Sequence, residues 1–190
     1  MPQYSTFERS HPIFVTMNRQ YIISKSTAQD INQLLLLINS AYRGEKAKKG
    51  WTHEADLIEG NIRTDEAMLL ELINKENAVI LKCTNENDNL LGCVYLEKQD
   101  QQLYLGMLSV SPQLQGGGIG KELLKASDQH AKEVDCSSII MNVIPARHEL
   151  IAWYARHGYT DTGKRKPFPT DNRFGTPREP LDFIVLQKDL

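Results

Sequence analysis

The chain has 190 residues, 41% of them hydrophobic, which is enough for one domain with a substantial buried core. Its formal net charge of −2 at pH 7 argues against nucleic acid as a partner. No stretch approaches the roughly 18 apolar residues of a membrane span, and we expect neither a membrane partner nor a signal peptide.

The cysteines indicate a reducing environment. Cys83, Cys93 and Cys136 lack the spacing of a metal site, so we expect reduced thiols buried in the fold and no bound metal. Because disulfides are rare in the cytosol, this usage favours a cytoplasmic protein.

The N-terminal part of the chain predicts a strand and two helices. Residues 1–18 are polar, and we expect an irregular extension ahead of a single domain over residues 19–190. Tyr21–Lys25 predicts the first strand, and Thr27 with Asp30 three residues later is typical of a capping box that starts a helix. The next elements are a polar loop and a second helix, over residues 43–50 and 67–73.

The second part of the chain predicts a mixed sheet. Three strands in quick succession are antiparallel candidates, and later strands are separated by helical patterns. The last strand follows a connection rich in proline and glycine over residues 166–180, and as an edge strand it could pair with a second copy in a homodimer. The expected elements are strands over 78–83, 91–98, 102–110, 138–143 and 181–186, with helices from 119 and over 149–156.

A glycine cluster lies between the strand that ends at Val110 and the helix that follows. Gly116, Gly117, Gly118 and Gly120 have no Cβ, so the turn can adopt positive φ and a ligand can approach the main chain. The free amides of the following helix and its dipole favour an anion there. We therefore expect a phosphate or pyrophosphate ligand.

The spacing of the glycines excludes two common phosphate motifs. A Walker loop needs glycine where Gln115 stands and a hydroxyl residue where Glu122 stands. The dinucleotide fingerprint needs a third glycine at Lys121. What remains is the pattern Gln-x-x-Gly-x-Gly.

This pattern, from Gln115 through Gly118 to Gly120, resembles the pyrophosphate-binding motif of the GNAT superfamily of N-acetyltransferases. Later in the chain, Tyr154 and the pair Gly158-Tyr159 resemble the family's Tyr-x-x-x-Gly-Phe/Tyr helix. The two motifs stand in the family's order, with a strand between them. The resemblance implies an α/β fold with a central mixed, largely antiparallel sheet flanked by helices, in which a splayed pair of strands holds CoA.

The resemblance also implies an activity and a cofactor site. It implies that an acetyl group moves from acetyl-CoA to a primary amine of a small molecule or peptide by direct attack. Tyr154 would protonate the departing CoA thiolate as a general acid, whereas we expect Trp153 beside it in the core. The implied cofactor contacts are the main chain of Leu108 and Val110 and a phosphate loop formed by Gln115, Gly116, Gly118, Gly120 and Lys121.

The catalytic base is open, because the strand over residues 104–110 lacks the carboxylate that the family often has there. Glu54 is the first candidate, followed by Glu97, although both are also typical of solvated carboxylates. His53 is a further candidate, and an amine that arrives neutral needs no base.

The acceptor is also open. Arg43, Trp51, Arg63 and Arg147 could orient a carboxylate-bearing acceptor, or they could be ordinary surface residues. Because the strand over residues 104–110 lacks a carboxylate, a second function class remains open: a non-catalytic acyl-CoA-binding or regulatory module.

Overall fold

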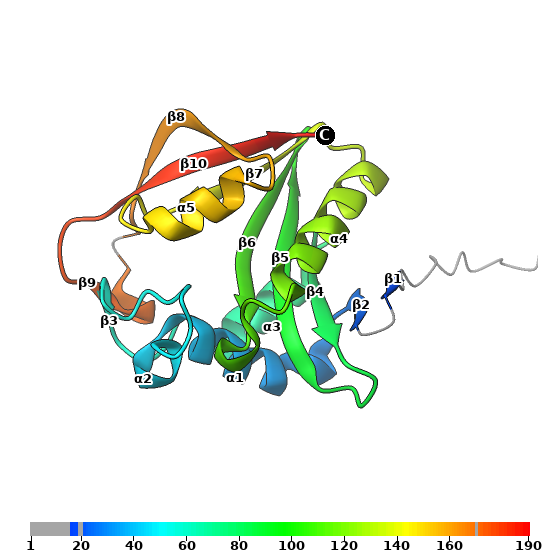
Figure 1. Ribbon diagram of the computed structural model, residues 1–190, viewed down its shortest axis with the longest axis horizontal. Helices are drawn as coiled ribbons and strands as arrows, with labels where there is room; N and C mark the ends of the chain where they lie inside the picture. The colour runs from blue at the N-terminus through cyan, green and yellow to red at the C-terminus, as the bar shows by residue number, and fades with distance from the viewer. Residues whose placement is uncertain (1–15, 19–20, 170) are drawn as a thin grey trace, which may run out of the picture.

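A twisted sheet forms the centre of the protein, which the computed structural model describes over residues 16–18, 21–169 and 171–190. In this part of the chain the sheet has eight strands, ordered β1-β2-β4-β5-β6-β7-β10-β8 (Figure 1). Neighbouring strands are antiparallel except β6 and β7, so the expected mixed, largely antiparallel sheet is confirmed. The strands are β1 (Thr16–Asn18), β2 (Tyr21–Lys25), β4 (Ala78–Thr84), β5 (Leu90–Gln99), β6 (Gln102–Val110), β7 (Ser138–Val143), β8 (Thr160–Pro167) and β10 (Asp182–Asp189), with a separate pair β3 (Ile58–Glu59) and β9 (Thr176–Pro177).

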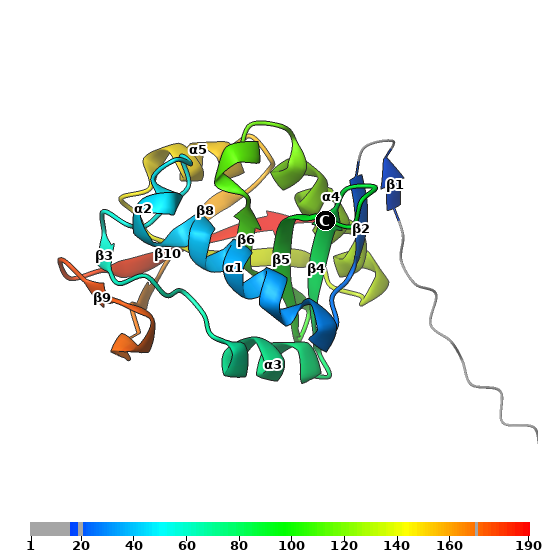
Figure 2. The same ribbon diagram turned by 90° about the horizontal axis from the view of Figure 1, so that it is seen from below.

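Helices cover both faces of the sheet (Figure 2). The first helix follows a short 3₁₀ turn, Ala28–Asp30, at which Thr27 and Asp30 form the expected capping box. Asp65 caps the N-terminus of the next long helix, where its side chain accepts a hydrogen bond from the amide of Met68. The α-helices are α1 (Ile31–Tyr42), α2 (Gly44–Ala47), α3 (Glu66–Asn74), α4 (Ile119–Glu133) and α5 (His148–Ala155).

Two hydrophobic clusters hold these layers together. On one face, α1 and α3 pack on the sheet through residues such as Leu34 and Leu69. On the other face, α4 and α5 pack through Leu123 and Leu150. Each fully buried leucine or isoleucine stabilises the fold by about 1.5–3 kcal/mol relative to an exposed one. The central strands are therefore apolar on both faces, which explains the uninterrupted run over residues 79–81.

Strands β6 and β7 pair for only a short distance and then diverge (Figure 1). Their parallel pairing covers residues 102–104 of β6 and 138–140 of β7. Further along β6, Met107 and Leu108 stand opposite the single residue Val94 of β5, and Met107 has a φ of 47°. This extra residue is a β-bulge, which bends and twists the strand that carries it. The bulge and the short pairing confirm the splayed strand pair.

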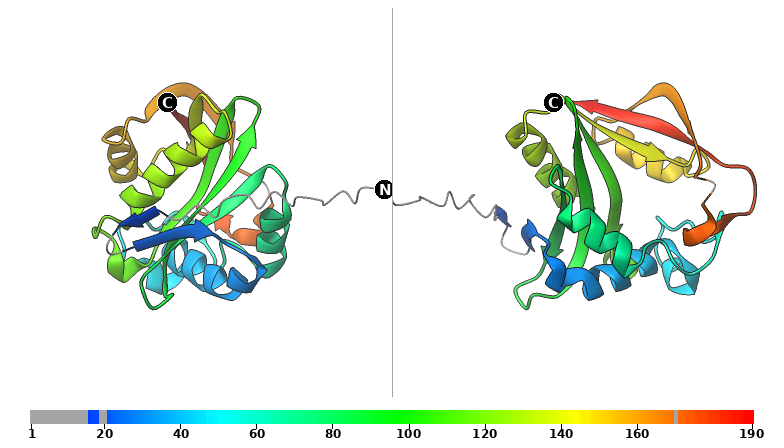
Figure 3. Two further views of the ribbon diagram at one scale, coloured as in Figure 1. Left: turned by 90° about the vertical axis from the view of Figure 1, so that its right-hand side faces the viewer. Right: turned by 180° about the vertical axis from the view of Figure 1, so that it is seen from behind.

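Two expectations about the C-terminal part are wrong. A strand, β8, lies just before and within the start of the expected connection, and β10 lies between β7 and β8 rather than at an edge. The segment 181–186 is therefore not free to pair with a second copy. The edges are β1 and β8, at opposite ends of the sheet (Figure 3). β8 carries Lys164, Arg165 and Lys166 and is mostly exposed, which is typical of an edge strand protected by charge.

The N-terminal part differs from expectation in two places. The segment 43–50 contains the short helix α2, and residues 16–18 pair with β2 instead of being irregular. The rest of the proposed extension lies outside the described residues, so the domain bounds stay a prediction. Cys83, Cys93 and Cys136 are free and buried. No helix in the described ranges combines the length and the apolar character needed to cross a bilayer.

Candidate active site

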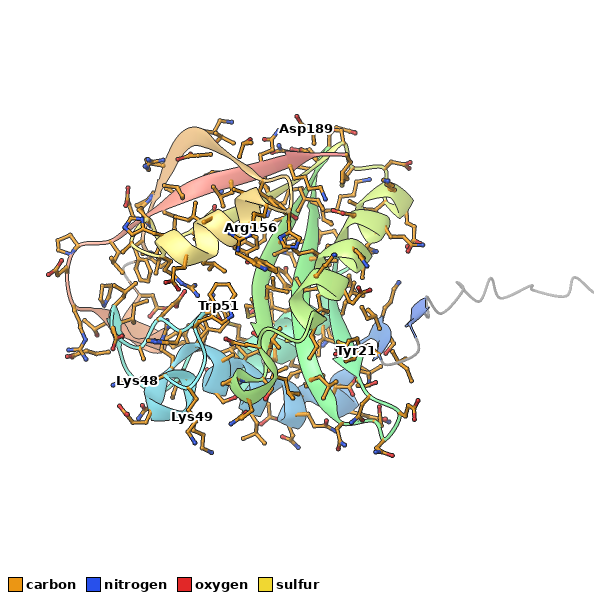
Figure 4. All side chains as sticks on the ribbon, in the orientation of Figure 1. Tyr21, Lys48, Lys49, Trp51, Arg156 and Asp189 are labelled. Atoms are coloured by element: carbon orange, nitrogen blue, oxygen red, sulfur yellow. The ribbon has the colours of Figure 1, made fainter. Side chains whose placement is uncertain are left out.

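A cavity of about 610 Å³ lies where β6 and β7 diverge. It is bounded by α5 and by the segments around residues 42–63 and 168–175, and its size is within the range of small-molecule and cofactor sites. Figure 4 labels Trp51 on the loop that faces α5. Most of the residues singled out from the sequence line this one cavity: Arg43, Trp51, Glu54, Arg63, Leu108, Val110, Gln115, Gly116, Gly118, Gly120, Lys121, Arg147, Trp153 and Tyr154.

The glycine loop forms one end of the cavity and has room for an anion. Gly116 and Gly118 have φ values of +86° and +89°, and a Cβ on either would meet nothing within 4 Å. The first helical hydrogen bond of α4 runs from the amide of Glu122 to the carbonyl of Gly118, at 3.1 Å. The amides of residues 119–121 precede that bond and lie at the positive end of the helix dipole. The loop therefore fits a phosphate group.

The Gln115 side chain bonds to protein groups and does not point toward the phosphate position. Its Oε1 accepts a hydrogen bond from the amide of Trp51 at 2.9 Å. Its Nε2 donates to Thr52 Oγ1 at 2.9 Å and to the carbonyl of Val110 at 3.3 Å. A Cβ on Gly50 would come within 2.7 Å of Gln115, so this glycine allows the close approach. Gln115 therefore ties the loop at residues 50–52 to the end of β6, and only its backbone is left for a ligand.

The main chain of β6 is partly engaged as well. The carbonyl of Leu108 accepts a hydrogen bond from the Tyr42 hydroxyl at 3.1 Å. The carbonyl of Val110 accepts the bond from Gln115 already described. Because a carbonyl oxygen has two lone pairs, each retains one acceptor position for a ligand.

Tyr154 presents a protonated hydroxyl at the cavity wall. The residue is 5% exposed, and burial raises the pKa of its phenol well above the usual range. Its ring packs edge to face with Trp153 and Tyr159, at centroid distances of 5.1 Å and 5.6 Å. No hydrogen bond joins the hydroxyl to another residue of the described chain. The phenol is therefore protonated at neutral pH, and its hydroxyl is available as a donor to a group in the cavity.

Trp153 meets the expectation of a core residue only in part. It is half-buried and lines the cavity, although one side packs against the core. A Cβ on Gly120 would stand 3.4 Å from the indole ring. The third glycine of the motif thus lets α4 approach α5. The indole also meets Trp51 edge to face, with ring centroids 6.3 Å apart.

Glu54 is the shared acceptor of two arginines. Arg43 Nη1 donates to Glu54 Oε2, and Arg147 Nη1 donates to Oε1 at 3.0 Å. Arg147 also donates through Nη2 to the carbonyl of Thr52. Burial alone raises the pKa of Glu54, but the charges of Arg147 and Arg43 outweigh it, so the pKa lies below its usual value. A carboxylate that is ionised and paired at both oxygens is a poor acceptor for a further proton.

The other base candidates are outside the cavity. Glu97 accepts hydrogen bonds from Lys75 at 2.6 Å and from the Tyr95 hydroxyl at 2.7 Å, and neither it nor His53 is among the lining residues. Neither side chain is therefore positioned to act on a substrate bound in this cavity. The described residues also contain no group of three or more His, Cys, Asp or Glu side chains that could hold a metal.

Several lining residues were not singled out from the sequence. Asn142 had a usable signal, since it is polar within the apolar strand β7, and its Oδ1 is buried without a partner among the described residues. The aromatic residues had none, because each resembles an ordinary core residue. The residues missed include Tyr42, Thr52, Tyr104, Asn142, His157, Phe168, Asp171, Phe174 and Phe183.

Comparisons with known proteins agree with this geometry. Residues 37–159 match the family model described as the acetyltransferase (GNAT) family. The fold is similar to that of ribosomal-protein-S18-alanine N-acetyltransferase from Escherichia coli, with a TM-score of 0.66 and 14% identity over 89% of this chain and 93% of that chain. For PaiA N-acetyltransferase from Thermoplasma acidophilum in complex with coenzyme A, the TM-score is 0.63 and the identity 17%, over 90% and 99%. No curated protein sequence matches the chain.

Proposed function

The chain belongs to the GNAT family of acetyltransferases, and from this premise we propose that it transfers the acetyl group of acetyl-CoA to a primary amine of a small molecule or peptide. The observation that carries this proposal is a continuous cavity with a phosphate-sized glycine loop at one end and a protonated tyrosine in its wall. The amine would enter from the side of residues 42–63.

We assign the cofactor site from the groups of the cavity that match the parts of acetyl-CoA. Gly116, Gly118 and the amides of residues 119–121 would hold the pyrophosphate, with Lys121 beside them, and the free acceptor positions of Leu108 and Val110 would hold the pantetheine arm. Acetyl-CoA supplies an activated thioester carbonyl to the acceptor amine. The coenzyme A seen in the structure of the Thermoplasma acidophilum protein, which has the same fold, supports this assignment.

Tyr154 is assigned the role of general acid. The departing sulfur of CoA needs a proton, and the Tyr154 hydroxyl carries one at neutral pH, since the pKa of a phenol is about 10 and burial raises that of Tyr154 further. Its ring is held between Trp153 and Tyr159, so the donor is oriented before the substrates bind.

No dedicated base is assigned. Deprotonating a lysine-like amine at pH 7 costs about 4–5 kcal/mol. The arginines of the cavity reduce this cost, because nearby positive charge favours the neutral form of an amine. Arg43, Arg63 and Arg147 all line the part of the cavity beside residues 42–63, which we call the acceptor end. We therefore assign the loss of the amine proton to solvent, assisted by the positive field of these arginines.

The first test is acetyl-CoA consumption with a panel of amino acids, polyamines, aminoglycosides and peptide amines. Mass spectrometry of the products separates true acceptors from acetylation of the protein's own thiols. An acetylated amine supports the proposal. Bound acetyl-CoA with no acetylated amine would contradict it and favour a non-catalytic binding module.

Gly118→Leu is expected to weaken acetyl-CoA binding at least about tenfold. The new side chain would fill the space above the loop, which is open in the native protein. Isothermal titration calorimetry measures the affinity directly. Because leucine at positive φ also strains the backbone by about 1–2 kcal/mol, a matched control is needed.

Gly163→Leu is that control. Gly163 has a φ of +76° and equally open surroundings, but it lies on β8, outside the cavity. This variant should bind acetyl-CoA as the native protein does. Unchanged affinity in Gly118→Leu, or equal losses in both variants, would contradict the pyrophosphate assignment.

A further inference from the structure

One arginine at the acceptor end of the cavity has no counter-ion. Arg43 and Arg147 share Glu54, whereas Arg63 makes no ion pair with any carboxylate of the described residues. The guanidinium of Arg63 lies over the ring of Tyr42, 5.5 Å from its centroid. The charge of Arg63 helps to lower the pKa of Glu54, but no hydrogen bond or ion pair joins the two side chains, so the donors of the guanidinium remain available to an anion.

Arg63 is held firmly, although it lies in a segment without regular structure. Asn39 on α1 accepts hydrogen bonds from the amide of Arg63 at 2.6 Å and from the amide of Thr64 at 3.0 Å. The Asn39 side-chain amide donates in turn to the carbonyl of Thr64 at 3.0 Å. The backbone that carries the guanidinium is thus fixed before a ligand arrives, which lowers the entropy cost of binding.

The charge of the acceptor end points to the same class of ligand. Apart from Lys121 beside the glycine loop, three arginines and two carboxylates line the cavity, and the second carboxylate, Asp171, is exposed. Glu54 is already shared by Arg43 and Arg147. Arg63 is therefore the arginine of the cavity that has no carboxylate bound to its guanidinium in the described residues.

The far wall of the cavity is apolar. Phe168, Phe174 and Phe183 line it, and the rings of Phe168 and Phe183 stand 5.1 Å apart. Such a wall favours a ligand with an apolar body.

We propose that the acceptor is an amine that also carries a carboxylate, in the form of a free α-amino acid with an apolar side chain, and that Arg63 selects it by binding the carboxylate. The inference rests on the proposed acetyl transfer and specifies the acceptor class. A guanidinium offers a planar pair of donors that matches a carboxylate, and the pairing would be bidentate. A peptide N-terminus is the main competitor, because it presents the same amine beside a neutral amide.

The test compares L-phenylalanine, L-phenylalaninamide and phenethylamine, which share one aromatic body. For the native protein we expect kcat/KM for the acid to exceed that for the amide and the amine at least tenfold. Basicity cannot produce the preference over the amide, because the negative carboxylate makes the neighbouring ammonium harder to deprotonate than in the amide. The comparison with the amide therefore decides the test, since phenethylamine is the more basic amine.

Substitution of the arginine identifies the selecting residue. Arg63→Gln should raise KM for the acid at least tenfold and leave the KM for acetyl-CoA unchanged, whereas kcat/KM for the amide should fall much less, because the amide loses only one charge of the surrounding field. Arg63→Lys, which keeps the charge but not the planar fork, should recover part of the preference. Arg156→Gln removes an exposed arginine that does not line the cavity (Figure 4) and should behave as the native protein.

Each remaining outcome overturns the inference. Equal or faster acetylation of the amide would assign the site to peptide N-termini, and an unchanged preference in Arg63→Gln would remove Arg63 from recognition. No product from any of the three compounds also overturns it. In that case acetylation of other amines would leave the proposed function standing, whereas failure to bind acetyl-CoA would refute both.

Discussion

Replacement of Tyr154 by phenylalanine is expected to lower kcat about a hundredfold or more, with little change in the affinity for acetyl-CoA. The substitution removes only the hydroxyl that would protonate the CoA sulfur. The ring keeps its edge contacts with Trp153 and Tyr159, so the fold and the cavity wall should be retained. Steady-state kinetics with the acceptor found in the panel give kcat, and calorimetry gives the affinity.

Tyr159→Phe is the matched control for this experiment. Tyr159 is also buried, its hydroxyl has no hydrogen-bond partner in the described part of the chain, and it does not line the cavity. Removing an unpaired buried hydroxyl should leave kcat unchanged and not destabilise the fold. A native rate in Tyr154→Phe, or the same loss in both variants, would exclude Tyr154 as the general acid.

Local patterns predicted most of the sheet and the place of the glycine loop. The strands over 102–110 and 138–143 have the predicted bounds, because each is an apolar run ended by a proline or a polar turn. The strand over 160–167 was missed, because its charged residues suit an exposed edge and carry no apolar alternation. Nor does any local pattern signal the positive φ of Met107, a residue type that rarely adopts it.

The site was predictable where a motif specifies backbone geometry and unpredictable where side chains meet across the chain. The glycines of the loop are required by their positive φ and open surroundings, so their spacing is visible in the sequence. The pairing of Glu54 with Arg147 joins residues 93 positions apart, and the sequence offers no local sign of it. The same holds for Gln115, whose side chain bonds to a loop 63 positions away.

These long-range contacts converge on residues 51–54. Gln115, beside the glycine loop, is hydrogen-bonded to the amide of Trp51 and to the Thr52 side chain. Arg147 donates to the Thr52 carbonyl and to Glu54, and Arg43 also donates to Glu54. The position of residues 51–54 therefore depends on the buried carboxylate of Glu54. The main contribution of Glu54 is to hold this segment in place, so removing its charge should lower the stability of the fold before it affects proton transfer.

Glu54→Gln is expected to lower the free energy of unfolding at pH 7 by about 3 kcal/mol, since it leaves the buried Arg43 and the largely buried Arg147 without a counter-ion. The loss should depend on pH. Because the folded-state pKa of Glu54 is depressed, its stabilising effect is fully present above the unfolded pKa of about 4.3 and is lost as the pH falls through the folded value. Urea unfolding at several pH values should therefore show the difference between native and variant protein shrinking below about pH 4.

Glu59→Gln provides the comparison. Glu59 pairs with Arg178 at 2.7 Å, but both side chains are at least half exposed, so its loss should cost less than about 1 kcal/mol. If Glu54→Gln kept native stability and lost kcat alone, Glu54 would be the base after all. A fall in stability that is larger at neutral than at acid pH assigns it instead to positioning the acceptor end, which leaves the removal of the amine proton to the field of the arginines and to solvent.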